Sequence, residues 1–169
     1  MDENLIISEN NPELMNLLLG DELYIVHEQK WYANIAHDGN NKHRFLNVFA
    51  HQGANPIPAE DRDFFFRIIT SIKNDKFSMD ADGFAVVNAE AFPGLSWKNL
   101  EQVFSPRYCI FWGVDPIQFG INCKLNGGIV VNQCRILFTD PIDQIANDVE
   151  KKKRLWQIFQ RMFDINKGS

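Results

Sequence analysis

The apolar residues of this chain are grouped into short runs that stop at turn residues. The run Tyr108 to Trp112 is unbroken and is followed by Gly113 and then by Asp115-Pro116. A short apolar run without polar alternation, bounded by turn residues, is typical of a strand buried on both faces. Strands of that kind occur in parallel sheets covered by helices on either side. This run therefore predicts the central strand of an α/β fold.

The rest of the chain alternates between runs typical of strands and runs with helical spacing. Ser96 is the predicted N-cap of one helix, and Asp140 is the predicted N-cap of the last helix, with Pro141 at its first position. The last helix is expected to break near Asn147-Asp148. The predicted strands are 23–26, 45–50, 83–88, 108–112, 129–131 and 134–138, and the predicted helices are 13–19, 64–72, 97–104 and 141–163.

This alternation predicts right-handed crossovers between parallel strands. We expect an α/β fold of three layers, with a mostly parallel central sheet of four to five strands and helices on both faces. No linker or repeat divides the chain, so residues 1–169 are predicted to form a single α/β domain. Residues 1–11 are predicted to be a loosely attached N-terminal segment.

Composition narrows the class of protein. The net charge of −5 provides no global basic field that would collect nucleic acid, so binding of a polyanion would need a local patch. The three cysteines form no Cys-x-x-Cys pair, and the chain starts with acidic residues and contains no apolar run of about 20 residues. These features predict reduced thiols, no membrane span and a cytoplasmic location.

Polar side chains follow three of the predicted strands. Carboxyl ends of parallel strands meet at one edge of a sheet, so loops 51–58, 113–116 and 139–141 are expected to come together there. An imidazole near carboxylates is suited to general acid–base chemistry. The alternative is structural, with Asp140 capping a helix, Asp115 closing a turn and His51 solvating a loop. The residues of this candidate cleft are His51, Asn55, Trp112, Asp115, Thr139 and Asp140.

No motif indicates a cofactor or a metal. The chain has no glycine-rich phosphate loop and no Gly-x-Ser-x-Gly nucleophile motif, and its histidines never stand at i, i+4. No cofactor, metal or catalytic residue is therefore predicted. One basic cluster, Lys151-Lys152-Lys153-Arg154, predicts either a solvated helix face or a contact with an acidic partner or a phosphate backbone.

The order of these elements resembles the psi subunit family of bacterial DNA polymerase III. The resemblance rests on the leucine-rich opening helix ending near Gly20, the strand 45–50 leading into a proline loop and a helix, Asp140-Pro141 after the last strand, and Leu155-Trp156-Gln157 in the closing helix. It covers most of residues 12–164 through short motifs. It implies a non-enzymatic, psi-like protein-interaction subunit in a DNA replication or repair assembly, with a clamp-loader or chi-like subunit as its partner.

The same loops resemble, more remotely, those of uracil-DNA glycosylases. Phe111-Trp112-Gly113 is similar to the Leu-Trp-Gly of that family. Asn55 stands in place of the aspartate that positions water, and Asp140-Pro141 stands where the family has a histidine that stabilises the leaving base. This resemblance implies the glycosylase layout with its catalytic motifs lost. The alternatives left open are an enzyme of glycosylase ancestry that acts on DNA or a nucleobase, and a small-molecule binder that uses the same cleft.

Overall fold

The computed structural model describes residues 31–74 and 78–165. Within them, five strands form one sheet in the order β2-β1-β3-β5-β4. Neighbouring strands are parallel except for the antiparallel pair β4 and β5, and β3 is the middle strand, as the apolar run predicts. The strands are β1 (Phe45–Phe49), β2 (Phe84–Asn88), β3 (Tyr108–Trp112), β4 (Gly128–Val131) and β5 (Cys134–Thr139).

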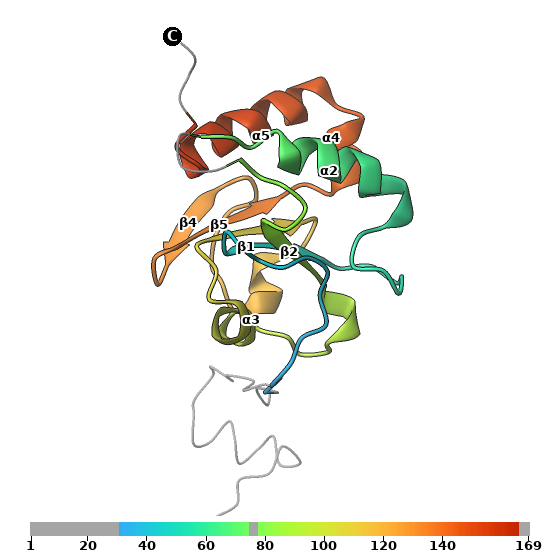
Figure 1. Ribbon diagram of the computed structural model, residues 1–169, viewed down its shortest axis with the longest axis vertical. Helices are drawn as coiled ribbons and strands as arrows, with labels where there is room; N and C mark the ends of the chain where they lie inside the picture. Colours follow the sequence, from blue (N-terminus) through green and yellow to red (C-terminus); the bar gives the residue numbers. More distant parts are fainter. Residues whose placement is uncertain (1–30, 75–77, 166–169) are drawn as a thin grey trace, which may run out of the picture.

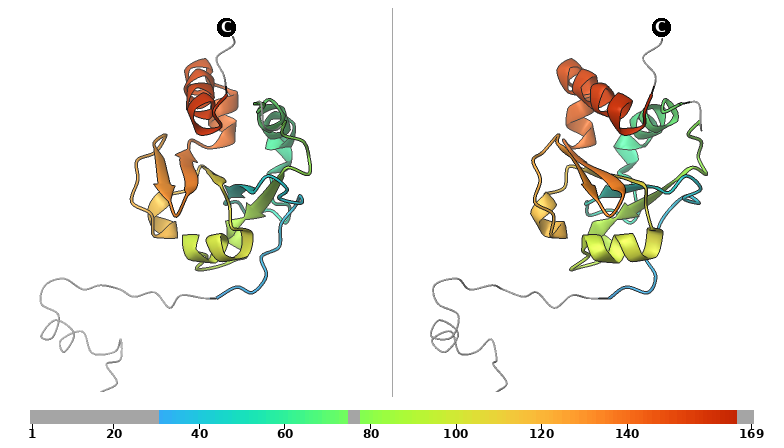
Figure 2. Two further views of the ribbon diagram at one scale, coloured as in Figure 1. Left: turned by 60° about the vertical axis from the view of Figure 1, so that its left-hand side comes forward. Right: turned by 90° about the vertical axis from the view of Figure 1, so that its left-hand side faces the viewer.

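Helices cover both faces of this sheet, which confirms the predicted three-layer α/β class. One face carries α2, α4 and α5, and the other carries α3, as Figures 1 and 2 show from three directions. The predicted helix 13–19, the predicted strand 23–26 and the segment 1–11 lie outside the described residues. The helices are α2 (Arg62–Thr70), α3 (Trp97–Phe104), α4 (Ile142–Ala146) and α5 (Val149–Met162), and the short 3-10 turns are η1 (Ala59–Asp61), η2 (Ala89–Ala91) and η3 (Pro116–Phe119).

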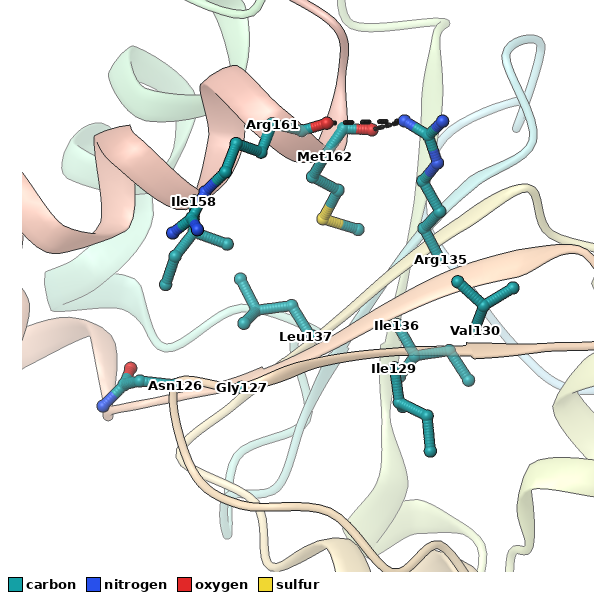
Figure 3. A pocket seen from close by; sticks show the side chains of 11 residues that line it. Asn126, Gly127, Ile129, Val130, Arg135, Ile136, Leu137, Ile158, Arg161 and Met162 are labelled. Atoms are coloured by element: carbon teal, nitrogen blue, oxygen red, sulfur yellow. Dashed lines mark hydrogen bonds between the residues drawn. The ribbon is translucent and has the colours of Figure 1, made fainter.

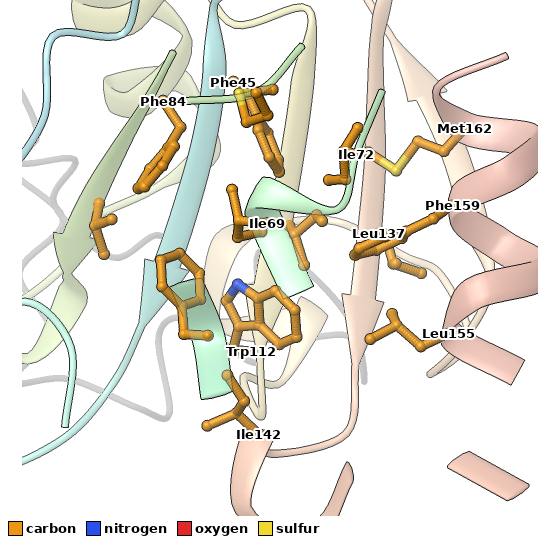
Figure 4. Packing of buried hydrophobic residues seen from close by; sticks show 14 of the residues in the cluster. Phe45, Ile69, Ile72, Phe84, Trp112, Leu137, Ile142, Leu155, Phe159 and Met162 are labelled. Atoms are coloured by element: carbon orange, nitrogen blue, oxygen red, sulfur yellow. The ribbon is translucent and has the colours of Figure 1, made fainter. Parts of the chain in front are cut away.

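Aromatic rings fill the core on each side of the sheet. Beneath α2 and α5, the rings of Phe45 and Phe159 are completely buried (Figure 4), as is that of Phe65. On the α3 side, Phe111 of β3 stacks on Phe138 of β5 with 4.2 Å between ring centroids. Successive residues of a strand point to opposite faces, so each of these central strands contributes large side chains to both clusters. That is why the sequence of β3 is an unbroken apolar run.

The predicted cap of α3 and the predicted break near Asn147-Asp148 are confirmed, and the predicted cap at Asp140 is wrong. Ser96 caps α3 by accepting a hydrogen bond from the backbone N–H of Asn99, and the Asn99 side chain accepts one from the backbone N–H of Ser96. Asp148 caps α5 after the predicted break. At α4, Pro141 occupies the N-cap position, and no side chain caps the helix. The Asp140 carboxylate instead contacts residues distant in the sequence.

The tight turn predicted between the last two strands is present. Asn132 and Gln133 connect β4 to β5 with φ angles of 46° and 69°. Positive φ at both central residues matches the right-handed twist of the two strands. The antiparallel β4 thereby forms one edge of a sheet that is otherwise parallel, so half of its backbone polar groups face away from β5.

Candidate functional site

The carboxyl ends of the four parallel strands lie along one edge of the sheet. Phe49 at the end of β1 pairs with Asn88 at the end of β2, and Trp112 of β3 pairs with Thr139 of β5. The backbone N–H of Gly113 also donates to the Thr139 carbonyl at 3.0 Å. The loops 51–58, 113–116 and 139–141 therefore leave the sheet at the same edge.

Asn88 holds the first of these loops in place. Its side-chain amide donates to the carbonyl oxygens of His51 and Gly53, both at 2.9 Å. Its carbonyl oxygen accepts from the backbone N–H groups of His51 and Glu90, both at 3.2 Å. All the hydrogen-bonding capacity of this buried side chain serves the backbone. Sequence reasoning missed Asn88, and the available signal was an asparagine at the end of an otherwise apolar strand.

The His51 imidazole is folded back on its own loop. Its Nδ1 accepts from the backbone N–H of Gly53 at 3.1 Å, so in the neutral ring the proton is on Nε2. Nε2 is buried and has no hydrogen-bond partner among the described residues. Asn55, farther along the same loop, is exposed to solvent. The loop thus places a histidine and an asparagine at the edge but points them to different surroundings.

A carboxylate near this histidine is held in an unfavourable environment. Burial raises the pKa of Asp61 above its ordinary value, and the neighbouring carboxylates of Asp143 and Glu60 raise it further, while His51 opposes them. Asp61 occupies the N-cap position of α2, yet its side chain makes no capping hydrogen bond. Sequence reasoning missed the position of Asp61 beside His51.

Trp112 lies in the core, so its predicted place at the rim of the site is wrong. Its side chain is 3% exposed and stacks on Phe49 with 6.0 Å between ring centroids. The indole N–H donates to the side-chain oxygen of Asn47 at 3.1 Å. Because successive residues of a strand point to opposite faces, Trp112 points with Ile110 into the cluster beneath α2, where Figure 4 shows it beside Ile142 of α4.

The remaining three candidates have structural contacts. The Asp115 carboxylate accepts from the backbone N–H of Ile117 at 3.0 Å and caps η3, in agreement with the structural alternative. The Thr139 hydroxyl donates to the Asn126 side-chain oxygen at 3.1 Å. The Asp140 carboxylate accepts from the Asn126 amide at 3.0 Å and pairs with Lys151 at 3.2 Å. Thr139 and Asp140 thereby fasten the loop before β4 and the start of α5 to the edge of the sheet.

The basic cluster 151–154 is divided among several contacts along α5. Lys151 pairs with Asp140, and Lys153 pairs with Glu150 at 2.9 Å. The Lys152 ammonium lies over the ring of Phe64 of α2, 5.5 Å from its centroid, and Arg154 is exposed. Consecutive residues of a helix face different directions, so the cluster is not one uniform patch.

An apolar groove of about 180 Å³ runs between α2 and α5. We call it the α2–α5 groove. The side chains of Phe64 and Ile68 form one wall, and Trp156, at 38% exposure, forms part of the other. Trp156 and Val149, both on α5, are exposed to solvent. The full lining is Phe64, Ile68, Ser71, Ile145, Lys152, Leu155, Trp156 and Phe159.

A second groove, of about 410 Å³, lies between α5 and the β4–β5 hairpin (Figure 3). Arg135 closes one end by donating to the Met162 carbonyl at 2.6 Å and pairing with Asp164 at 3.0 Å. These contacts hold the last turn of α5, because carbonyls at a helix end lack partners within the helix. None of the six candidate cleft residues lines either groove.

Comparison with protein-family models and with curated proteins finds no match. In the part of the chain that the structure describes, no group of three or more His, Cys, Asp or Glu side chains is arranged to hold a metal ion. No helix within residues 31–74 or 78–165 has both the length and the apolar character needed to cross a membrane.

Proposed function

We propose that this protein is a non-enzymatic interaction subunit, psi-like, that works in a DNA replication or repair assembly. The observation that carries the proposal is the use of polar groups at the carboxyl edge of the sheet. Asn88, Asp115 and Asp140 are all engaged in fastening loops and helix starts. In an α/β enzyme this edge supplies the reacting groups.

The apolar surface lies elsewhere, along the closing helix. Both described grooves border α5, and Trp156 in the Leu-Trp-Gln of that helix is partly exposed. Partly exposed tryptophan beside an apolar groove is typical of binding surfaces for proteins. The psi-like order of elements suggests the kind of assembly, a DNA replication or repair complex. It also suggests a clamp-loader or chi-like subunit as the partner.

A pull-down tests this proposal. The tagged full chain is incubated with nuclease-treated lysate of its native cell, and the same tag on an unrelated acidic α/β protein is the control. We expect clamp-loader or chi-like subunits to be enriched with the tagged chain and absent from the control. Recovery of no replication or repair protein would count against the assignment.

One observation favours the runner-up, an enzyme of glycosylase ancestry. His51 keeps a buried N–H without a partner among the described residues, at the edge where the three loops leave the sheet. Release of uracil from uracil-containing DNA is the direct assay. We expect no turnover above a blank. Turnover that is abolished by His51→Ala or Asp140→Ala would replace the proposed function with the enzymatic one.

A further inference from the structure

We propose that the α2–α5 groove is the docking site for an acidic, amphipathic helix of a partner protein. This inference rests on the proposed function and adds to it the surface that is used and the chemistry of what binds there. The groove contains the two properties that such a helix would need, an apolar floor and unneutralised positive charge at its mouth.

The walls of the groove have the spacing that holds a helix. Phe64, Ile68 and Ser71 follow one another at i, i+4 and i+7 along α2. Lys152, Leu155, Trp156 and Phe159 follow at i, i+3, i+4 and i+7 along α5. Each helix thus presents one stripe to the groove, and a third helix can pack between two such ridges with its own i, i+3, i+4 and i+7 residues as anchors.

Positive charge gathers at one aromatic ring on the mouth of the groove. Arg67 of α2 lies 5.8 Å and Lys152 of α5 lies 5.5 Å from the centroid of the Phe64 ring. Both side chains are exposed, and neither forms an ion pair with a carboxylate of a described residue. By contrast, Lys151 and Lys153 on the same helix each have an acidic partner. A partner helix with Glu or Asp beside its apolar stripe would supply the missing anions.

Two other occupants fit less well. Single-stranded nucleic acid needs open aromatic faces for stacking, whereas cations already lie over Phe64, and the floor is made of side chains such as Leu155 and Phe159. A second copy of this chain that used the same groove would bring its own Arg67 and Lys152, which lack an ion pair with a described carboxylate, against the same two residues. Like charges at the centre of such a contact oppose association.

Photocrosslinking in nuclease-treated native lysate locates the partner. A photoreactive phenylalanine replaces Trp156 in the full chain, and the matched control replaces Ile117 of η3, which is 79% exposed and does not line the groove. We expect the probe at position 156, and not the probe at position 117, to form an adduct with a replication or repair protein. The crosslinked peptide should come from an acidic, apolar segment.

The other outcomes separate the two proposals. A replication protein captured at position 117 and not at 156 overturns the groove assignment and keeps the proposed function. An acidic, apolar helix of a protein unrelated to DNA, captured at 156, keeps the groove and overturns the proposed function. An adduct with residues 1–30 of this chain or with a second copy overturns the choice of a partner helix. The absence of any adduct at position 156 overturns the groove assignment, and the pull-down described above then decides the proposed function separately.

Charge reversal then tests the chemistry with a synthetic peptide of the crosslinked segment. Arg67→Glu combined with Lys152→Glu should weaken its binding to the full chain at least tenfold and flatten the salt dependence. Lys42→Glu combined with Lys124→Glu makes the same charge change at exposed sites away from the groove and should alter binding less than twofold. Equal effects of the two pairs would overturn the specific role of Arg67 and Lys152.

A labelled 20-nucleotide oligothymidine is the probe for the competing class of ligand. We expect no saturable binding to the full chain at physiological salt. Binding that the Arg67→Glu, Lys152→Glu variant abolishes and the Lys42→Glu, Lys124→Glu variant retains would assign the groove to nucleic acid.

Discussion

Asn47 brings an amide into the centre of the apolar core. Its side chain is 0% exposed, and its oxygen accepts the indole N–H of Trp112 at 3.1 Å. The amide nitrogen has no partner among the described residues. A buried polar atom without a partner is destabilising, so the one bond to Trp112 is what compensates for burying this amide.

Trp112→Phe is expected to lower the free energy of unfolding by about 2–4 kcal/mol, since it removes that bond and leaves a space in the core. Asn47→Leu, which has a similar size and no polar atoms, should lessen this loss when both changes are combined. Urea unfolding of the two single variants and the double variant measures the coupling. Strictly additive losses would contradict a specific Asn47–Trp112 interaction.

Gly113 is the second residue with a clear structural requirement. Its φ is +65°, and a Cβ added there would lie 2.9 Å from Cγ and 3.0 Å from Cα of Pro141. Gly120 is the matched control, because its φ is +71° and no atom lies within 4 Å of its added Cβ. Both glycines have a left-handed backbone conformation, but only Gly113 has an atom of Pro141 close to where a Cβ would lie.

Gly120→Ala is expected to cost about 1–2 kcal/mol from backbone strain alone. Gly113→Ala should cost roughly a further 1–3 kcal/mol, because the proline must move. Thermal or urea unfolding of both variants gives the difference. Equal destabilisation of the two would mean that the contact with Pro141 adds nothing.

The wrong prediction for Trp112 has a physical reason. The run 108–112 contains no polar position, so nothing in the sequence tells which face of the sheet Trp112 occupies. Its side chain follows Ile110 into the cluster beneath α2. The end of β3 was predicted correctly. Which face its last side chain points to depends on how the strand is paired in the sheet, and the sequence does not show that pairing.

At the scale of elements, helix starts show what local sequence can predict. Ser96 caps α3 through Asn99, three residues away, and that pairing is visible in the sequence. Asp140 was predicted by the same reasoning and instead contacts Asn126 and Lys151, which are 14 and 11 residues away. A short-range cap can be predicted from spacing, whereas a choice between a cap and a distant partner depends on the folded arrangement.

The start of α5 makes a prediction about pH. The backbone N–H of Lys151 is the main cause that lowers the pKa of the Asp148 carboxyl below its ordinary value. Desolvation opposes this shift, while the N–H of Glu150 and the positive charges of Lys151 and Arg154 add to it. A carboxyl whose pKa is lowered on folding contributes its full stabilisation at pH values above its ordinary pKa of 3.8, the value expected in the unfolded chain. That contribution is lost as pH falls through the folded pKa.

Asp148→Asn keeps an N-cap side chain and removes the charge. We expect the wild type to be the more stable protein at pH 7 and the difference to shrink as pH falls below about 4. Urea midpoints across a pH series measure it. A difference that is unchanged at pH 2.5 would contradict an electrostatic role for the Asp148 carboxylate.

At the scale of the whole molecule, the three cysteines differ in how deeply they are buried. Cys109 in β3 and Cys134 in β5 are buried, and Cys123 is partly exposed; all three are free thiols. Burial raises the pKa of Cys109 well above its ordinary value and that of Cys134 to about 12. Burial also raises the pKa of Cys123, which is the most accessible of the three.

We therefore expect one thiol per chain to react with a disulfide reagent well before the other two. Reaction requires an accessible thiolate, so Cys109 and Cys134 should be modified only when the sheet opens. Mass spectrometry of samples quenched over time identifies the modified residue. Modification of Cys109 as fast as Cys123 would show that the central strand opens without global unfolding.

Charge is unevenly distributed between the start of the chain and the rest. Residues 1–30 contain seven carboxylates and one lysine, whereas the remainder contains 15 carboxylates and 16 lysines and arginines. The net charge of −5 therefore arises in residues 1–30, where the balance is −6, against +1 for the remainder. The whole-chain value could exclude a global basic field, but it could not predict that α5 carries local positive charge.

The four tryptophans occupy different environments, and this gives the protein its own optical probes. Trp97 and Trp112 are 7% and 3% exposed, whereas Trp31 and Trp156 are 60% and 38% exposed. Trp31→Phe would leave Trp156 as the main source of red-shifted emission, and the blue-shifted emission would come from the two buried rings. Occupation of the α2–α5 groove would then shift the red component alone, and unfolding would shift both, so that one spectrum distinguishes binding from loss of structure.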